Sequence, residues 1–168
     1  MSDKILLNVN GEIVSKSVLT VSGGSSDAGK TIGTDLNGKI DMSLMPSGIG
    51  ADTTTLLASE SLNIGDFVNI WDDAGTIKVR KADNSDSTKV ANGFVKVAVA
   101  SGSNAVIYTE GDNDTLTGLA VGTRYFLGVT GSYTSTVPTI LGSIIQSLGT
   151  VKNPTTIRFE QKDPIKNA

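Results

Sequence analysis

Short apolar runs bounded by turn residues recur through the second part of this chain, and they constrain its fold more than any other feature. The clearest is segment 76–82, in which Ile77 and Val79 alternate with basic residues, the period-two pattern of a half-buried strand. One residue in three is Gly, Ser or Thr, a composition that favours turns and strands over helices. About seven short strands at regular spacing therefore predict an all-β fold, a small β-barrel or sandwich.

The expected strands have definite faces. Val95, Val97 and Val99 fall on one face of an expected strand over 94–100, so we expect all three to be buried. Trp71, the only Trp, lies in a strand pattern and is expected to pack in the core. The strands are expected at 66–71, 76–82, 94–100, 105–110, 124–129, 143–148 and 155–159.

The first fifty residues differ from the rest, and we interpret 1–50 as an extended N-terminal arm or linker that precedes a β domain over 51–168. Asn10-Gly11 is the strongest short signal for a two-residue hairpin turn, so a hairpin is predicted within 4–21. Residues 23–52 then carry seven glycines and almost no hydrophobic periodicity. Such a segment cannot bury enough apolar surface to offset its ordering entropy, so an external partner is expected to order it.

Four apolar residues stand out inside this arm: Ile40, Met42, Leu44 and Met45. One interpretation is a linker whose few apolar residues rest on the parent domain. The other is a docking strip, because exposed apolar residues on an extended segment attach an arm to a partner. The sequence supports the two interpretations about equally.

The amino-acid composition excludes most kinds of catalytic site. The chain has no Cys and no His, which excludes disulfides, thiolate zinc sites, Cys nucleophiles and the Ser-His-Asp triad. A net charge of −3 argues against a nucleic-acid surface, and no apolar run approaches the length that crosses a membrane. The N-terminus does not read as a signal peptide. We therefore expect a protein that is not an enzyme, without catalytic residues, cofactor or metal.

One motif match is formally specific. Residues 24–31 satisfy the P-loop pattern G-x-x-x-x-G-K-[ST], but a working P-loop must run into a helix, and two glycines and an Asn-Gly pair follow within seven positions. A flexible loop is the favoured interpretation. Acidic clusters such as 83–86 and 112–114 lack the spacing of a calcium loop, so we interpret them as turn caps.

The run 28–46, which reads AGKTI and then DLNGKIDMSLMP, resembles a linker of tailed-bacteriophage virion proteins that joins an N-terminal piece to a small β domain. At Asn92 those proteins often have a His. The similarity spans most of the chain from Ala28, and it continues through segments 65–71, 79–82, 92–95, 117–119, 122–127, 138–139, 142–149 and 156–159.

The resemblance implies a structural virion protein, assembled in the host cytoplasm and usually trimeric. Its implied partners are the major capsid protein or another virion protein, with no nucleic acid and no membrane. We expect a capsid decoration (cement) protein that binds the phage head through its arm, with Ile40, Met42, Leu44 and Met45 as the contact residues. The alternatives are a short head, neck or tail fibre protein, and a carbohydrate-binding receptor-recognition module, which requires an exposed aromatic cleft.

Overall fold

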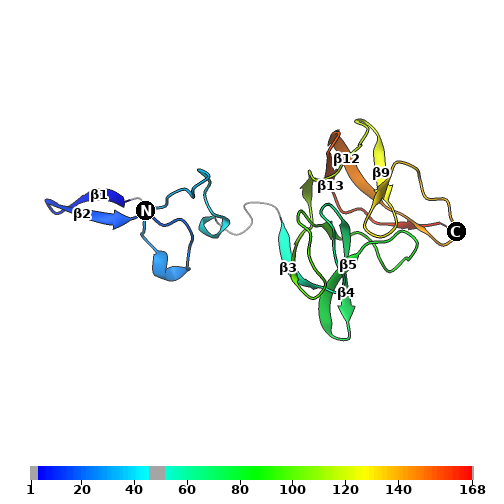
Figure 1. Ribbon diagram of the computed structural model, residues 1–168, viewed down its shortest axis with the longest axis horizontal. Helices are drawn as coiled ribbons and strands as arrows, with labels where there is room; N and C mark the ends of the chain where they lie inside the picture. Colours follow the sequence, from blue (N-terminus) through cyan, green and yellow to red (C-terminus); the bar gives the residue numbers. More distant parts are fainter. Residues whose placement is uncertain (1–3, 46–51, 168) are drawn as a thin grey trace. The chain divides into compact units, whose positions relative to one another are not determined.

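The computed structural model describes residues 4–45 and 52–167, and the chain divides into two compact units, Met1–Gly50 and Ala51–Ala168 (Figure 1). We call them the N-terminal unit and the β unit, and each is described by itself. Within the described residues the regular structure is strand, apart from two single-turn 3₁₀ helices. The all-β prediction is confirmed.

The N-terminal unit begins with a hairpin of β1 (Lys4–Val9) and β2 (Glu12–Ser17), paired antiparallel from Lys4 opposite Ser17 to Val9 opposite Glu12. Asn10 (φ 54°) and Gly11 (φ 92°) form the two-residue turn. Both residues have positive φ, as the primed turns of two-residue hairpins require, so the Asn-Gly signal predicted the turn correctly. Two short 3₁₀ helices follow, η1 (Ser25–Asp27) and η2 (Met42–Leu44).

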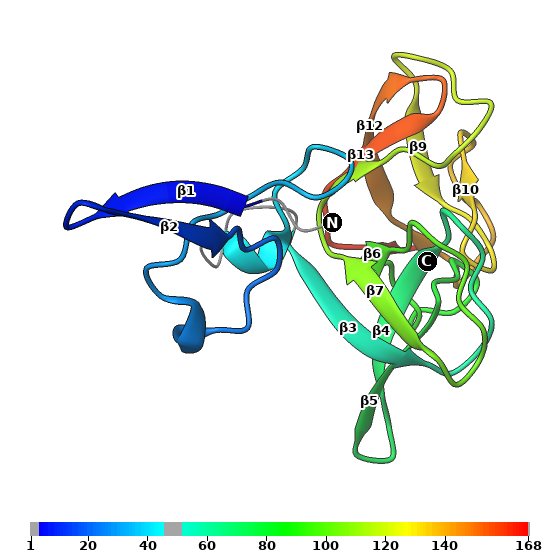
Figure 2. The ribbon, with the colours of Figure 1, turned by 60° about the vertical axis from the view of Figure 1, so that its left-hand side comes forward.

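The first half of the β unit is a closed five-stranded barrel with the order β3-β5-β4-β6-β7. β3 pairs antiparallel with β7 over five residues and parallel with β5 at Leu57 and Ala58, and this parallel pairing closes the barrel (Figure 2). Its strands are β3 (Thr53–Ala58), β4 (Phe67–Asp73), β5 (Thr76–Lys81), β6 (Gly93–Phe94) and β7 (Asn104–Tyr108).

The second half is an antiparallel sheet with the order β10-β9-β12-β13-β8. A separate two-stranded pair joins β11 (Ile144–Ile145) to β14 (Ile165–Lys166) near the end of the chain. Both ribbon views show the barrel strands on one side of the β unit and β9, β12 and β13 on the other. The sheet strands are β8 (Gly111–Asn113), β9 (Arg124–Leu127), β10 (Tyr133–Thr134), β12 (Ser147–Asn153) and β13 (Thr156–Phe159).

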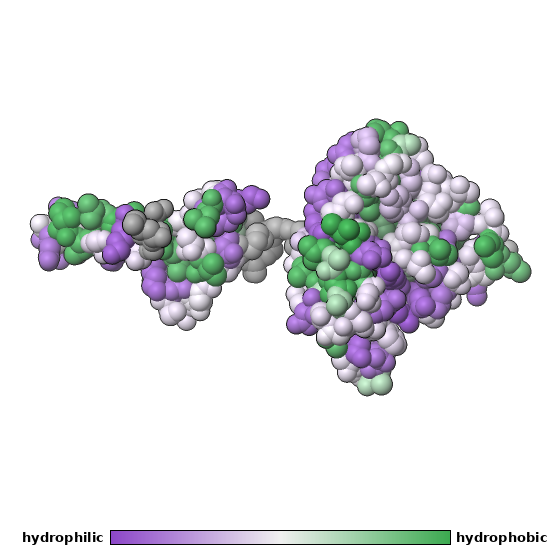
Figure 3. Space-filling view, in the orientation of Figure 1, coloured by the Kyte–Doolittle hydropathy of each residue, from purple (hydrophilic) through white to green (hydrophobic). Residues whose placement is uncertain are grey.

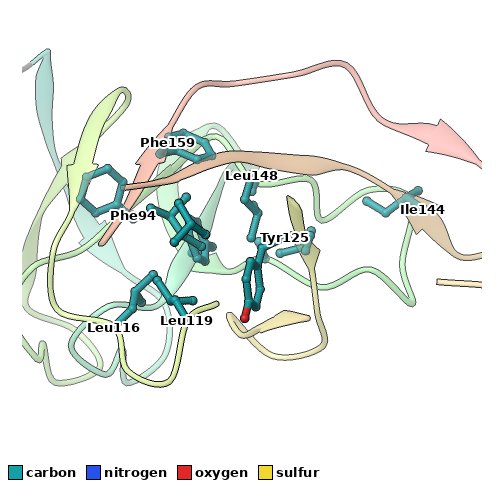
Figure 4. Packing of buried hydrophobic residues seen from close by; sticks show 13 residues of the cluster. Phe94, Leu116, Leu119, Tyr125, Ile144, Leu148 and Phe159 are labelled. Carbon is teal, nitrogen blue, oxygen red and sulfur yellow. The ribbon is translucent and has the colours of Figure 1, made fainter. Parts of the chain in front are cut away.

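The β unit has two hydrophobic clusters. The smaller fills the barrel with branched side chains such as Val68, Val79 and Ile107. The larger lies against the sheet and contains a group of aromatic rings (Figure 4), in which the centroids of Phe67 and Phe159 are 5.6 Å apart. Full burial of one such ring stabilises the fold by about 1.5–3 kcal/mol. Both clusters consist entirely of β-unit residues.

The expected strand over 94–100 is wrong beyond its first residue. Only Gly93–Phe94 is strand, and the chain then turns away, so Val95 and Val99 are buried while Val97 is 59% exposed. Ile77 also departs from its expected face, with 52% exposure against 0% for Val79. The reason is the closure of the barrel: β3 meets β5 at Lys78 and Val79, and Ile77 lies beyond that contact toward the turn.

Candidate partner-binding surface

The loop that follows the hairpin folds back on itself in the N-terminal unit. Leu19 and Ile32 form an isolated parallel bridge, in which the Leu19 N–H donates to the Thr31 carbonyl at 2.8 Å. The Ser22 N–H donates to Ser43 Oγ at 2.8 Å, which ties the segment around η2 to the start of the loop. Residues 19–32 and 43–45 are therefore brought together although they are far apart in sequence.

An open hollow of about 380 Å³ lies where these segments meet, and we call it the loop pocket. Its large apolar lining residues are Leu19, Ile32, Leu44 and Met45. The remaining lining is Ser22, Gly24, Asp27, Ala28, Gly29, Lys30 and Ser43. The loop pocket thus combines large apolar side chains with polar and charged ones, the usual composition of a binding site.

The four predicted contact residues differ in their exposure and in whether they line the loop pocket. Leu44 is half-buried and Met45 is 38% exposed, and both line the loop pocket. Ile40 is 49% exposed but is not part of the lining, and Met42 opens η2 with a side chain outside the described part of the molecule.

Sequence reasoning missed Leu19 and Ile32, which also line the loop pocket. Leu19 lies between Val18 and Thr20, Ile32 lies between Thr31 and Gly33, and no periodicity links positions thirteen residues apart. Their proximity comes from the backbone bridge between them, and the sequence carries no signal for that bridge.

The P-loop match has no phosphate cradle. After η1, Gly29 takes φ 75° and the chain does not enter an α-helix within the described residues, so the loop lacks the helix N-terminus that a P-loop requires. The Lys30 ammonium instead donates to Asp27 Oδ1. That hydrogen bond, together with the Gly23 N–H, holds the pKa of the Asp27 carboxyl below its usual value. Lys30 therefore has a partner within its own loop.

The acidic clusters at 72–73 and 83–86 act as turn caps, as their composition predicts. Asp72 Oδ1 accepts from the Gly75 N–H at 2.7 Å, and Asp83 and Asp86 accept from the N–H groups of Ser85 and Thr88 at 2.9 Å. The same interpretation is wrong for 112–114, because Asp112 and Asn113 lie in β8 and the Asp112 carboxylate accepts from Lys152 Nζ at 2.6 Å. Among the described residues no three acidic side chains are placed to share a metal ion.

Trp71 is half-buried on the barrel and belongs to neither hydrophobic cluster, so the expectation of core packing is wrong. The Arg80 guanidinium lies over its ring, 4.5 Å from the centroid. Asn92, which stands where similar proteins often have His, accepts from the Ile70 N–H at 2.9 Å and from Asn69 Nδ2 at 3.0 Å. The surroundings of Trp71 are therefore built as a structural network rather than as an open aromatic platform.

A second hollow, of about 340 Å³, lies on the β unit where the loop over 137–141 approaches Asn84. We call it the β-unit pocket. Two of its lining residues, Ile140 and Leu141, are 77% and 78% exposed, and Asn167 Nδ2 donates to the Ile140 carbonyl at 3.2 Å. None of its lining side chains is charged: Asn84, Ser85, Val129, Thr134, Thr136, Val137, Pro138, Thr139, Ile140, Leu141 and Ser143. No strand pattern covers 130–142, so this surface could not be predicted from the sequence.

No protein-family model and no curated protein sequence matches this chain. Among solved structures, this chain is similar to "The crystal structure of head fiber gp8.5 N base in bacteriophage phi29", with a TM-score of 0.46 and 12% sequence identity. The similarity covers 68% of this chain and 99% of that chain. No helix in the described ranges is long and apolar enough to cross a membrane.

Proposed function

We propose that this protein is a non-enzymatic structural component of a tailed-phage virion, a capsid decoration protein that attaches through its N-terminal unit. The observation that carries the proposal is the contrast between the two units. The β unit encloses two hydrophobic clusters of its own, whereas no side chain of known burial between residues 4 and 45 is buried. The sequence resemblance to virion linkers over 28–46 supplies the class of protein.

A unit without a core needs an external surface to hold its conformation. The loop pocket gathers Leu19, Ile32, Leu44 and Met45, each still partly or largely open to solvent. Covering these side chains with a partner would contribute on the order of 4–8 kcal/mol before ordering costs. The proposed partner is the major capsid protein or another protein of the virion.

A homotrimer is part of the proposal, on the basis of the resemblance. The β-unit pocket supports self-association, because its uncharged lining includes the exposed side chains of Ile140 and Leu141, an apolar surface that a second copy would cover. Light scattering on Ile140→Asp/Leu141→Asp should give a lower mass than wild type. Val121→Asp, at a 63% exposed position outside this pocket, should not change the mass.

Attachment is tested by co-sedimentation with capsids that lack this protein. Leu44→Asp/Met45→Asp should lose most binding without lowering the melting temperature, because neither residue belongs to the clusters of the β unit. Leu36→Asp, at a fully exposed position outside the loop pocket, is the matched control and should bind like wild type. Wild-type binding by the double variant would exclude the loop pocket as the attachment site. Labelling on intact virions distinguishes decoration of the head from a short fibre at the head, neck or tail.

A further inference from the structure

The hairpin of the N-terminal unit has an open outer edge on β2. Among the described residues, the backbone groups of Ile13, Ser15 and Ser17 make no hydrogen bond outside the β1–β2 pair. Apolar side chains are also uncovered, with Leu6 at 71% and Ile13 at 63% exposure, and Figure 3 shows hydrophobic surface over this hairpin. A two-stranded hairpin alone is marginally stable in water, and an unpaired edge is a template for another strand.

The turn determines which backbone groups point outward. In a two-residue hairpin the pair next to the turn, Val9 and Glu12, is hydrogen-bonded, and hydrogen-bonded pairs alternate along the ladder. Glu12, Val14 and Lys16 of β2 therefore point their N–H and C=O groups toward β1. Ile13 and Ser15 present theirs at the free edge.

The charges of β2 are complementary to a second, antiparallel copy of the same strand. When two β2 strands pair about Val14, Ile13 faces Ser15 of the second copy, and both residues have outward backbone groups, so the ladder is satisfied. In the same register Glu12 faces Lys16 of the second copy, twice by symmetry. These are non-hydrogen-bonded positions, where facing side chains approach most closely.

Other registers lack this match. Pairing about Ser15 also satisfies the backbone, but it places Lys16 opposite Val14 and leaves Glu12 beyond the strand. Pairing about Ile13 shortens the overlap and places Glu12 opposite Val14. Only the register about Val14 combines the outward backbone groups with two opposite-charge pairs.

We propose that the free edge of β2 binds β2 of a second copy of this chain, antiparallel and centred on Val14, to give a four-stranded sheet β1-β2-β2-β1. The contact uses one edge per copy, so it joins copies two at a time. In a trimer held by its β units, it would link neighbouring trimers. The inference does not depend on the capsid partner, and its test requires no capsid.

Cysteine cross-linking tests the register, because the chain contains no Cys and each variant carries a single thiol. In full-length Val14→Cys the two thiols face each other at a distance that a disulfide spans, so mild oxidation should give a covalent dimer on a non-reducing gel. In Ser15→Cys the two Cα atoms are offset by two residues and exceed that distance. A cross-link in Ser15→Cys but not in Val14→Cys would overturn the proposed register, and no cross-link in either would overturn self-pairing in favour of a different partner strand.

Charge-reversal variants, made without any added Cys, test the Glu12–Lys16 pairs between the two copies. Glu12→Lys and Lys16→Glu should each weaken dimerisation by about tenfold or more in sedimentation experiments, because each replaces two attractive pairs with two repulsive ones. The double variant Glu12→Lys/Lys16→Glu restores opposite charges and should recover association. Failure of the double variant to recover, with the hairpin intact by circular dichroism, would overturn the proposed charge pairing.

Discussion

Gln146 bonds both backbone groups of Ala91 with its side-chain amide, across 55 positions of sequence. Its Oε1 accepts from the Ala91 N–H at 2.7 Å, and its Nε2 donates to the Ala91 carbonyl at 3.0 Å and to the Lys162 carbonyl at 3.0 Å. The side chain is 1% exposed. The Gln146 side chain, immediately before β12, thereby connects Ala91, which precedes β6, with Lys162, which precedes β14.

Gln146→Ala should be among the more damaging polar substitutions in this protein. It leaves the buried N–H and C=O of Ala91 without partners, and each unsatisfied buried group costs about 1–3 kcal/mol. We expect the free energy of unfolding in urea to fall by about 2–4 kcal/mol. Gln161→Ala, at an exposed position, should change it by less than about 0.5 kcal/mol. Equal losses for the two variants would show that the amide is not structurally important.

Replacement by Asp should destabilise the fold strongly at Val95 and hardly at all at Val97. Val95→Asp places an unpaired charge in the barrel cluster and should destabilise the fold by several kcal/mol or prevent folding. Val97→Asp should change the free energy of unfolding by no more than about 0.5 kcal/mol, because this side chain is 59% exposed. Denaturation of the two variants side by side checks the chain path after β6.

Gly149 should be irreplaceable in β12. Its φ is 124°, and an added Cβ would fall on the carbonyl oxygen of Arg158 in the neighbouring strand. Gly149→Ala should therefore destabilise by clearly more than the cost of the backbone conformation alone, about 1 kcal/mol. Gly118→Ala is the matched control, since Gly118 also has positive φ (69°) but faces open space. Similar melting temperatures for both variants would contradict the close strand approach.

Stability should decline in acid and be flat near neutrality. Burial alone would raise the pKa of Asp83, but donation from the hydroxyl and N–H of Ser85 lowers it overall. The N–H and hydroxyl of Thr88 lower the pKa of Asp86. A carboxyl with a depressed folded-state pKa stabilises the fold above its unfolded value, and this contribution is lost as pH falls through the folded value.

The melting temperature should therefore stay level between about pH 5.5 and 8, since the chain has no His, and should fall below about pH 4. In Asp83→Asn/Asp86→Asn the acid decline should be shallower, and the melting temperature at pH 7 should be lower. Asp163→Asn, at an exposed position, should follow the wild-type curve. A steep transition near pH 6 would contradict this account.

Local signals in the sequence predicted local structure well. Asn10-Gly11 gave the turn, and the period-two pattern over 76–82 gave β5 (Thr76–Lys81) almost to the residue. Closure of the barrel by parallel pairing of β3 with β5 had no such signal, because it joins strands that are not consecutive. The seven predicted segments overlap β4, β5, β6, β7, β9, β11, the start of β12, and β13. The missed strands β8, β10 and β14 have only two or three residues, too short to show a period, but the prediction also missed the six-residue β3.

The candidate site was predicted only in part. Apolar residues in a polar segment indicated a contact surface near Leu44 and Met45, which depends on composition alone. Leu19 and Ile32 depend on a backbone bridge and on the Ser22–Ser43 hydrogen bond. The β-unit pocket depends on how the chain end holds the loop over 137–141, through Asn167.

Deleting residues 1–50 should leave a folded β unit. Both hydrophobic clusters consist of residues between Ala58 and Phe159, and neither the barrel nor the sheets formed by β8 to β14 include β1 or β2. We expect the truncated chain to show a β-type circular dichroism spectrum and a cooperative melt within about 4 °C of the full-length protein, which corresponds to a change of less than about 1 kcal/mol. It should no longer co-sediment with capsids, because the loop pocket is removed. A truncated chain that melts broadly would show that the N-terminal unit completes the fold, and one that still binds capsids at wild-type occupancy would move the attachment surface onto the β unit.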